Sequence, residues 1–460
     1  MTLTTKQLDE ILNTALKTGA DFAEIFIEES NQTSLFLEDN KIEKTKSGTD
    51  RGVGIRLIKD KTVAYCCSSD DSFPSLRDLA LRAAASFNDK RKTKPQELRP
   101  KISNMPYPIV RRPNEVPTEE KTAILEILNR TARSYGDKVK QVSARYMDSN
   151  QAITIVNSDG LYVEDNRIRT RYYVNVIAAR DGILQTGYEA PGGSCGFELL
   201  EEFPPEEMAR QAAERAILML DAKHAPAGKM QVVLASEAGG TLIHEACGHA
   251  FEADFIVKGT SVYMGKKGKK VASPLITVYD DGTLKGKFGT YRFDDEGTPS
   301  HNTILIENGI LKNYMSDYLN AKILDLPRTG NGRRESYRSR PIPRMTNTYI
   351  APGQTPPKQI IDSVKEGLLV KKMGGGEVNV TNGDFVFEVT EGYLIEKGKV
   401  KYPVRGAIII GNGPQILESI DMVGEDLEFQ TGVCGKFDHA PVSDGQPTIR
   451  IPEIVVGGRD

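Results

Sequence analysis

The chain has 460 residues, 39% of them hydrophobic and 27% charged, which excludes an intrinsically disordered protein and one that needs disulfides to fold. Its 60 basic and 63 acidic residues give a net charge of −3, whereas nucleic-acid-binding proteins usually carry a basic surplus. No apolar stretch approaches the ~18 residues of a membrane span. We therefore expect a globular protein that binds neither nucleic acid nor a membrane.

The N-terminus and the cysteines predict the compartment. The first residues lack the charged and apolar regions of a secretory signal. The five cysteines are an odd number, and Cys66 and Cys67 are adjacent, which fits a reducing compartment better than a disulfide framework. We therefore expect a cytoplasmic protein.

The first 89 residues predict a helix, several strands and a second helix. Thr4 and Gln7 have the spacing of a capping box, and apolar residues at helical spacing follow until Gly19. Strand patterns then cover 22–28, 33–38, 52–58 and 62–67. The second helix is expected at about 75–88.

The same order recurs after a connector at 90–117, which holds six of the 24 prolines and therefore suits neither a helix nor a central strand. Thr118 is expected to cap the next helix, and another helix is expected at about 205–220. Between them, strands are expected at 140–147, 152–157, 161–165, 168–179 and 183–190.

Two short matches indicate that this recurrence is an internal repeat. Residues 30–32 match 149–151, and residues 37–42 resemble 163–168. The domain prediction built on them is an N-terminal α/β domain over 1–220, containing a possible repeat of 1–89 and 118–220, followed by a β-rich catalytic domain over 221–460.

Glycine-punctuated strand patterns dominate the second half. They lie at 230–235, 275–280, 302–307, 376–380, 385–390, 393–396, 406–411 and 448–456, and helices are expected only near 238–254 and 357–367. The predicted fold class is therefore α+β, with duplicated N-terminal α/β units of antiparallel strands. A barrel-like or wrapped C-terminal sheet would carry the helix near 238–254.

His244, Glu245 and His249 form the motif that points to chemistry. Neutral imidazoles bind zinc, and a neighbouring glutamate can take a proton from water. Histidines five residues apart lie roughly 140° apart on a regular helix, too far to share one ion. A π-bulge would bring them together, and Gly248 lets the backbone deform. The sequence predicts either a distorted metal-binding helix or a buried helix with two core histidines.

A catalytic zinc site needs a third protein ligand, and the spacing leaves several candidates. Cys434 lies between glycines that predict a tight loop. Cys247 lies three residues after His244, and Glu252 is either a ligand or an acceptor for the ring N–H of His249. The further candidates are His439 and His301.

Additional blocks make the chain resemble a known family. The motif runs into Glu252 and Asp254, and the other blocks are 295–298, 329–337, 343–348, 434–436 and 445–447. Together they resemble the TldD/PmbA family of zinc-dependent peptidases, and specifically its catalytic TldD-type members. The resemblance implies Zn²⁺ bound by His244, His249 and Cys434, with Glu245 as the general base. It also implies peptide substrates and a dimer, either of this chain with itself or with a PmbA-type paralogue that lacks the metal motif.

Four residues in these blocks are candidates for substrate binding, and two more are candidates for supporting the metal ligands. Arginines near a scissile peptide can bind a carboxylate or stabilise an oxyanion, but an Arg–Glu network that holds loops explains them equally well. The substrate-binding candidates are Arg333, Arg334, Tyr337 and Arg344. The supporting candidates are Glu252 and Asp254.

The predicted function is zinc-dependent hydrolysis of unfolded or extended peptides. One alternative is a non-catalytic peptide-binding or assembly subunit of a peptidase complex, although Glu245 speaks against it because a mere ligand site needs no base. The other alternative is a metal-dependent hydrolase of a non-peptide amide, which would use the same residues.

Overall fold

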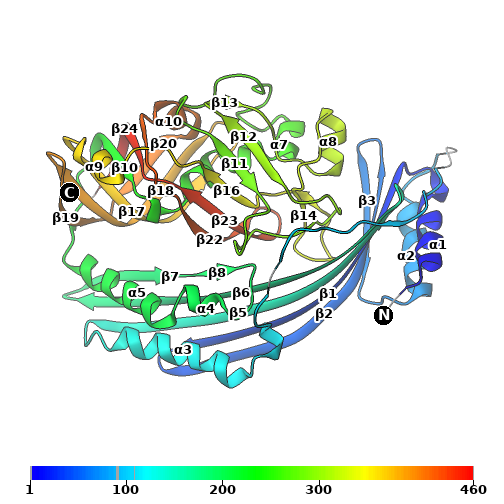
Figure 1. Cartoon of the computed structure of the whole chain (residues 1–460), viewed down its shortest axis with the longest axis horizontal. Coiled ribbons are helices and arrows are strands. Elements are labelled where there is room, and N and C mark those ends of the chain that lie inside the picture. The colour runs from blue at the N-terminus through cyan, green and yellow to red at the C-terminus, as the bar shows by residue number, and fades with distance from the viewer. Residues whose placement is uncertain (1–2, 90–92, 108, 459–460) are drawn as a thin grey trace.

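The computed structural model describes residues 3–89, 93–107 and 109–458. A long N-terminal sheet, flanked by helices, lies against a β-rich C-terminal body (Figure 1). Both parts are mixtures of helices and strands in which strands dominate, so the predicted α+β class is confirmed. Among the described residues, no helix is both long and apolar enough to cross a membrane.

Within the described ranges the N-terminal sheet has eight strands, and its central order is β3-β2-β1-β5-β6, with β7 pairing to β6. The helices are α1 (Thr5–Ala15), α2 (Phe73–Ala84), α3 (Thr118–Arg133), α4 (Leu199–Glu202) and α5 (Pro205–Leu220). The strands are β1 (Phe22–Glu38), β2 (Lys41–Lys59), β3 (Thr62–Ser68), β4 (Arg99–Pro100), β5 (Val139–Asn157), β6 (Leu161–Arg180), β7 (Ile183–Glu189) and β8 (Gly192–Gly193).

The strand order is symmetric about the antiparallel pair β1/β5. Asn31 lies directly opposite Asn150 in that pair, so the first sequence match falls at the centre of the sheet. The second match is not equivalent, because 37–42 spans the turn between β1 and β2 whereas 163–168 lies inside β6. The order of elements nevertheless repeats: helix, three strands and helix occur as α1-β1-β2-β3-α2 and again as α3-β5-β6-β7-α5.

Several N-terminal expectations need correction. The strands expected at 22–28 and 33–38 form the single strand β1, because the polar residues between them pair with both β2 and β5. Continuous pairing merges the expected strands in β5 and β6 in the same way. The capping box of α1 at Thr4 and Gln7 is confirmed. Thr118, however, is the first residue of α3 rather than its cap, and Pro117 stands at the cap position without a side-chain hydrogen bond.

The C-terminal body contains a closed barrel and a second sheet. The barrel order is β17-β10-β24-β20-β18, and pairing of β17 with β18 closes it. A six-stranded sheet has the order β13-β12-β11-β16-β23-β22. The barrel-like C-terminal sheet that the sequence predicts is confirmed.

The C-terminal elements have the following bounds. The helices are α6 (Thr241–Ile243), α7 (Ala253–Lys258), α8 (Tyr318–Leu324), α9 (Pro357–Asp362) and α10 (Gly413–Ser419). The first strands are β9 (Lys223–His224), β10 (Gly228–Leu234), β11 (Val278–Asp281), β12 (Asn302–Glu307), β13 (Ile310–Leu311), β14 (Gly332–Arg333), β15 (Ile342–Pro343) and β16 (Asn347–Ile350). The last strands are β17 (Glu366–Val378), β18 (Asp384–Glu396), β19 (Lys399–Arg405), β20 (Ile408–Asn412), β21 (Met422–Val423), β22 (Glu428–Gly435), β23 (His439–Gln446) and β24 (Ile449–Gly457).

Three C-terminal expectations also need correction. The helix expected near 357–367 ends at Asp362, and β17 begins four residues later. The strands expected at 385–390 and 393–396 are one strand, β18. Cys434 lies in strand β22, opposite Ala440 of β23, and not in a tight loop. We propose the domain division at 220/221, where α5 ends.

Buried ion pairs join the two parts of the molecule. Arg56 of β2 donates to Glu24 of β1 at 2.7 Å and to Glu296 of the C-terminal body at 2.6 Å. Arg334 of the C-terminal body also donates to Glu24, at 2.6 Å. All four side chains are almost fully buried. Because a buried charge without a partner is costly, this network fixes how the two parts sit against each other.

We predict that Arg56→Met lowers the free energy of unfolding by about 3–5 kcal/mol, because it leaves buried Glu296 without its cation and Glu24 with Arg334 alone. Urea unfolding followed by fluorescence or circular dichroism measures the change. The matched control is Arg82→Met, which breaks an exposed pair with Asp78 and should cost below about 0.5 kcal/mol. Equal effects of the two substitutions would contradict the assignment.

Candidate metal centre

The two motif histidines lie on a distorted helical turn. His244–Gly248 form one π-helical turn between α6 and a 3-10 turn at His249–Phe251. The backbone N–H of His249 donates to the carbonyl of His244, five residues back. The two rings are perpendicular and their centroids are 5.1 Å apart. The predicted distortion of the helix is therefore confirmed, and it brings histidines five residues apart onto one side.

Glycines allow this turn to pack closely on neighbouring strands. A Cβ at Gly248 would lie 2.2 Å from the sulfur of Met345. A Cβ at Gly240, just before α6, would lie 2.3 Å from the backbone nitrogen of Gly445 in β23. The small residues therefore let the motif sit directly against the sheet that carries Cys434.

Cys434 joins the two histidines from β22. Its Sγ lies 3.2 Å from Nε2 of His244 and 3.2 Å from Nε2 of His249. The three donor atoms lie within 4.8 Å of one another, and in the described part of the chain no other group of His, Cys, Asp and Glu converges in this way. The typical Zn–N and Zn–S bond lengths in a tetrahedral site would separate nitrogen and sulfur by about 3.6 Å. Small shifts would therefore accommodate zinc, and the donor set fits it.

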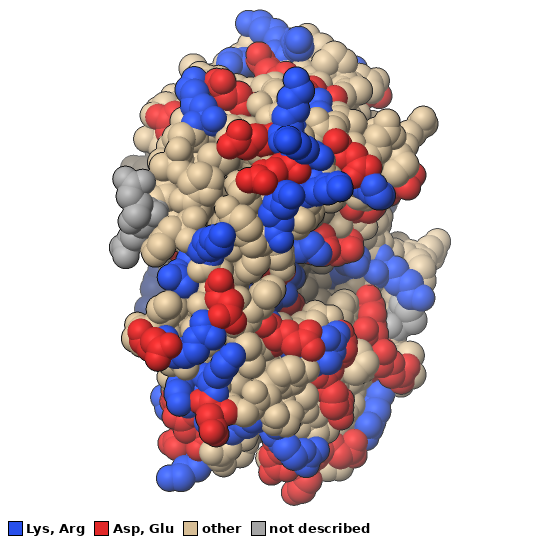
Figure 2. Space-filling view, turned by 90° about the vertical axis from the view of Figure 1, so that its left-hand side faces the viewer, with Lys and Arg blue, Asp and Glu red and all other residues tan. Residues whose placement is uncertain are grey.

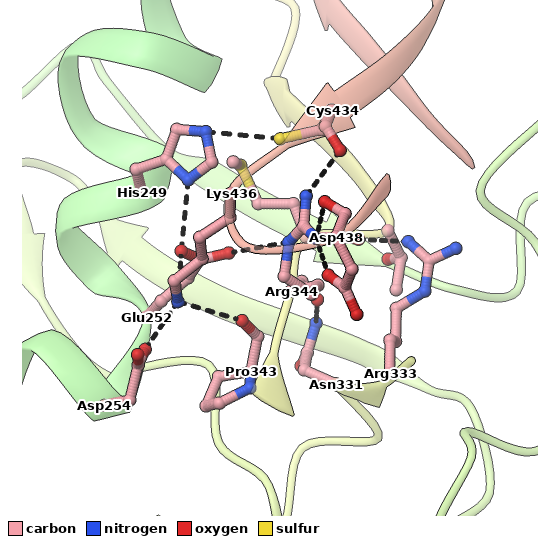
Figure 3. Close-up of polar contacts among 12 residues, drawn as sticks. His249, Glu252, Asp254, Asn331, Arg333, Pro343, Arg344, Cys434, Lys436 and Asp438 are labelled. Carbon is pink, nitrogen blue, oxygen red and sulfur yellow. Dashed lines mark hydrogen bonds and ion pairs between the residues drawn. The ribbon is translucent and has the colours of Figure 1, made fainter. Parts of the chain in front are cut away.

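The protonation of the cluster also suits a metal. Burial raises the pKa of the Cys434 thiol, but hydrogen bonds with His244 and His249 outweigh burial and lower it to about 5. The sulfur is therefore a thiolate, which is the form that binds zinc. Nδ1 of His249 lies 3.1 Å from Oε2 of Glu252, so Nδ1–H donates to the carboxylate and directs Nε2 toward the sulfur, where a metal ion would take the place of the Nε2 proton (Figure 3).

Glu252 is fully buried and connects the helical turn to the β22–β23 hairpin (Figure 3). Its Oε2 lies 3.0 Å from Nζ of Lys436, and its Oε1 lies 3.8 Å from Nε of Arg344. Burial raises the pKa of Glu252, but the cations of Lys436, His249 and Arg344 outweigh burial and lower it to about 2. Lys436 also contacts Asp254 at 2.6 Å.

Arg344 fastens the strand that carries the sulfur. Its guanidinium donates to the backbone carbonyl of Cys434 at 2.6 Å and to Oδ1 of Asp438 at 2.6 Å. The side chain is 1% exposed, so these contacts are shielded from water. The buried guanidinium of Arg344 therefore holds the β22–β23 hairpin next to the two histidines through two of its residues.

Glu245 lies at the edge of the cluster. Its Oε2 is 3.9 Å from Nε2 of His249, and its side chain is 29% exposed. Asp444 of β23 is buried and interacts electrostatically with His244 and Glu245. Burial raises the pKa of Asp444 to about 6, although the charge of His244 lowers it. A partly exposed carboxylate beside the donor atoms can exchange protons with water and with a substrate.

The other candidate third ligands lie outside the cluster. Sγ of Cys247 faces the hydroxyl of Tyr263 at 3.3 Å, and burial raises the pKa of the thiol to about 12. His301 is exposed and contacts the carbonyl of Pro299. His439 is exposed and lies 3.4 Å from Glu335. The geometry therefore favours Cys434 among the alternatives that spacing leaves open.

All four substrate-binding candidates have partners within the chain. Arg333 donates to the carbonyl of Met345 at 2.5 Å, and Arg334 binds Glu24. Tyr337 is 2% exposed, and its backbone N–H donates to Glu28 of β1 at 2.6 Å. Arg344, between β15 and β16, is equally buried and contacts Cys434 and Asp438 of the β22–β23 hairpin. Contact between any of the four and a substrate stays a prediction.

Sequence reasoning assigned no role to Lys436, Asp438 and Asp444. Lys436 and Asp438 lie at the tip of the β22–β23 hairpin, and Asp444 lies inside β23. The only signal was their position within or near the blocks 434–436 and 445–447. Their contact partners lie far away along the chain, so no local sequence pattern reveals these three residues.

Three family models match the chain over most of its length. They are the PmbA/TldA metallopeptidase domain 1 at residues 23–87, the central domain at 111–220 and the C-terminal domain at 227–458.

Named relatives and a solved structure agree with these matches. A Haemophilus influenzae protein named metalloprotease TldD homolog is 38% identical, over 99% of this chain and 97% of its own length. A Saccharolobus solfataricus protein named zinc metalloprotease TldD homolog is 28% identical, over 96% and 97%. The crystal structure of TldE from Thermococcus kodakarensis superposes with a TM-score of 0.79 at 22% identity, covering 98% of this chain and 100% of that chain.

The chain therefore belongs to the PmbA/TldD metallopeptidase family. Within that family, the relatives at 38% and 36% identity carry the TldD name, so the resemblance predicted from the motif blocks is confirmed.

We predict that Glu252→Gln weakens zinc binding by about 10- to 100-fold, because the neutral amide no longer orients the His249 ring as a strong acceptor. Competition with a chromophoric chelator measures the affinity, and circular dichroism verifies the fold. Glu335→Gln is the control, since Glu335 lies beside exposed His439. Unchanged affinity in a folded Glu252→Gln protein would contradict the role of Glu252.

Proposed function

We propose that the protein is a zinc-dependent metallopeptidase that hydrolyses unfolded or extended peptides. The observation that carries this proposal is the convergence of two imidazole nitrogens and one thiolate beside a partly exposed carboxylate. The names metalloprotease and zinc metalloprotease, which the relatives carry, support it.

His244, His249 and Cys434 would hold the zinc ion, and Glu252 would orient His249. When bound, zinc acts as a Lewis acid that polarises a carbonyl and makes water easier to deprotonate. Glu245 accepts the proton of the attacking water and passes it to the leaving amine, which is the work of a general base and then a general acid. The partial exposure of Glu245 supports this role, because both water and substrate must reach it.

An extended peptide fits the strand that carries the sulfur. β22 lies at the end of its sheet and pairs only with β23 among the described strands. An extended peptide can add to an edge strand through backbone hydrogen bonds, while pockets for its side chains give specificity. A peptide along β22 would pass beside Cys434.

The proposal extends to the assembly and the compartment. We propose that the chain acts as a dimer in the cytoplasm, either with itself or with a PmbA-type paralogue. The whole-length superposition on TldE supports a partner of the same fold.

Two other functions use the same architecture. A non-catalytic peptide-binding or assembly subunit would need no base, and Glu245 beside the donor atoms argues against it. A hydrolase of non-peptide amides would use the same residues, and peptide and non-peptide amides assayed side by side separate the two.

We predict that Glu245→Ala retains zinc and loses peptide hydrolysis by a factor of about 10² to 10⁴, because only proton transfer is removed. Elemental analysis and a fluorogenic peptide assay, with and without a PmbA-type paralogue, measure both properties. The matched control is Glu453→Ala, which removes an exposed carboxylate that pairs with Lys229 and lies outside both the cluster and its surroundings. Wild-type rates in Glu245→Ala would refute this mechanism.

We predict that Cys434→Ser lowers the bound zinc well below one equivalent, because a hydroxyl is a far weaker zinc ligand than a thiolate. Cys247→Ser is the control, since Cys247 faces Tyr263 and should leave the zinc content unchanged. Equal zinc in wild type and Cys434→Ser would remove Cys434 from the ligand set. If Cys434→Ser keeps its zinc and Cys247→Ser loses it, Cys247 is the third ligand and Cys434 is not.

A further inference from the structure

A cleft of about 1370 Å³ opens between the N-terminal sheet and the C-terminal body. One side consists of α5 and β7, and the other side consists of β17, β18 and the start of β22. Figure 2 views the molecule from this end and shows a recess between its upper and lower halves. The donor atoms of the metal centre do not line this cleft.

Aromatic and aliphatic side chains cover much of the cleft. Tyr188 of β7 is 46% exposed and Leu218 of α5 is 39% exposed, and both line the cleft. Exposed apolar surface in a concave site is typical of ligand binding. The aromatic lining residues are Tyr135, Tyr188, Phe203, Tyr393 and Phe429.

Carboxylates outnumber cations in the lining by six to three. All three cations already form ion pairs with cleft carboxylates: Lys371 lies 3.1 Å from Glu237, Lys372 lies 3.6 Å from Glu189, and Arg215 lies 2.7 Å from Glu189. Arg215 also pairs with Glu391. Two of the three remaining carboxylates, Glu214 and Asp221, pair with Arg210 and Arg180 outside the lining, which leaves Glu428 to complement a cationic ligand.

Glu428 is the lining carboxylate best placed to bind a cation. It lies at the start of β22 and forms no ion pair in the described part of the chain. Burial and the neighbouring Glu237 carboxylate raise the pKa of Glu428 against the opposing effects of Lys372 and a hydrogen bond with Ser236, so a cation from outside would stabilise the ionised carboxylate.

The cleft is continuous with the elements that carry the metal ligands. β22 runs from Glu428 to Cys434 in six steps, which span about 20 Å in an extended strand. Beside β22 on the same side of the cleft, the 3-10 turn at Ser236–Ala238 leads into α6 and then His244. The side chain of Gln430 donates to the carbonyl of Glu237 at 2.7 Å, so β22 and this turn are fixed to each other.

We propose that this cleft binds a segment of the extended peptide substrate that contains Lys or Arg together with aromatic residues, about six residues from the scissile bond. The proposal rests on the proposed peptidase function of the metal centre. The substrate cation pairs with Glu428, and the substrate aromatic residues pack on the apolar lining. The cleft would thus determine which peptides bind tightly, whereas hydrolysis at the metal centre would not depend on the residues bound in the cleft.

Peptide length and charge test the proposal. The probes are a peptide of about five residues, too short to span both sites, and peptides of about twelve residues that carry Lys and Phe at the N-terminal or the C-terminal end. A third set carries Glu in place of Lys. With the wild-type protein, one of the Lys-containing long peptides should have a KM roughly tenfold below that of the short peptide and of its Glu counterpart, at similar kcat.

Glu428→Lys should raise the KM of the Lys-containing peptide about tenfold and leave the short peptide unchanged. Glu428→Gln should give a smaller rise, and it serves as the second variant if charge reversal impairs folding. The matched control, Glu366→Lys, makes the same charge change at an exposed site outside the cleft lining and should change neither KM.

The outcomes separate this proposal from the proposed function. Cleavage of the short peptide with no dependence of KM on length, on Lys or on Glu428 would overturn the cleft assignment and leave the peptidase intact. No cleavage of any peptide would overturn the peptidase and, with it, the cleft assignment. A change of molecular mass in Glu428→Lys by light scattering, with an unchanged KM, would assign the cleft to subunit contact instead.

Discussion

The hydrogen bond from the His249 N–H to the His244 carbonyl sets the geometry on which the candidate metal centre depends. In a regular helix the two imidazoles would face different directions, and no single ion could bind both. The π-helical turn removes that offset, and the neighbouring strands accept it because Gly240 and Gly248 carry no side chain. A local departure from regular structure thus coincides with the chemistry, as π-bulges often do.

Two groups of buried charges, joined by the chain segment from Arg334 to Arg344, connect this turn to the rest of the molecule. Glu252 binds His249 on one side and Lys436 on the other, and Arg344 holds the carbonyl of Cys434. The segment that carries Arg344 also carries Arg334, which pairs with Glu24 in the N-terminal sheet. The position of the sulfur therefore depends on the contact between the two halves of the chain as well as on the hairpin that carries it.

Local sequence patterns predict the duplicated N-terminal units and the distorted helix. The signals, a capping box and two histidines five residues apart, each lie within one or two helical turns. The hairpin of β22 and β23 was missed, since glycines and Pro441 interrupt its alternation and resemble a loop. The partners of Arg344 could not be predicted either. Asp438 lies 94 residues away along the chain, and only the folded sheet brings the two together.

The central claim is that one sulfur and two imidazole nitrogens bind the same zinc ion. X-ray absorption at the zinc edge of the zinc-loaded protein tests it most directly. The account predicts one sulfur scatterer at about 2.3 Å and two imidazole nitrogens at about 2.0–2.1 Å, with any remaining ligand a light atom. A coordination shell without sulfur, or one with a single imidazole, would contradict the account.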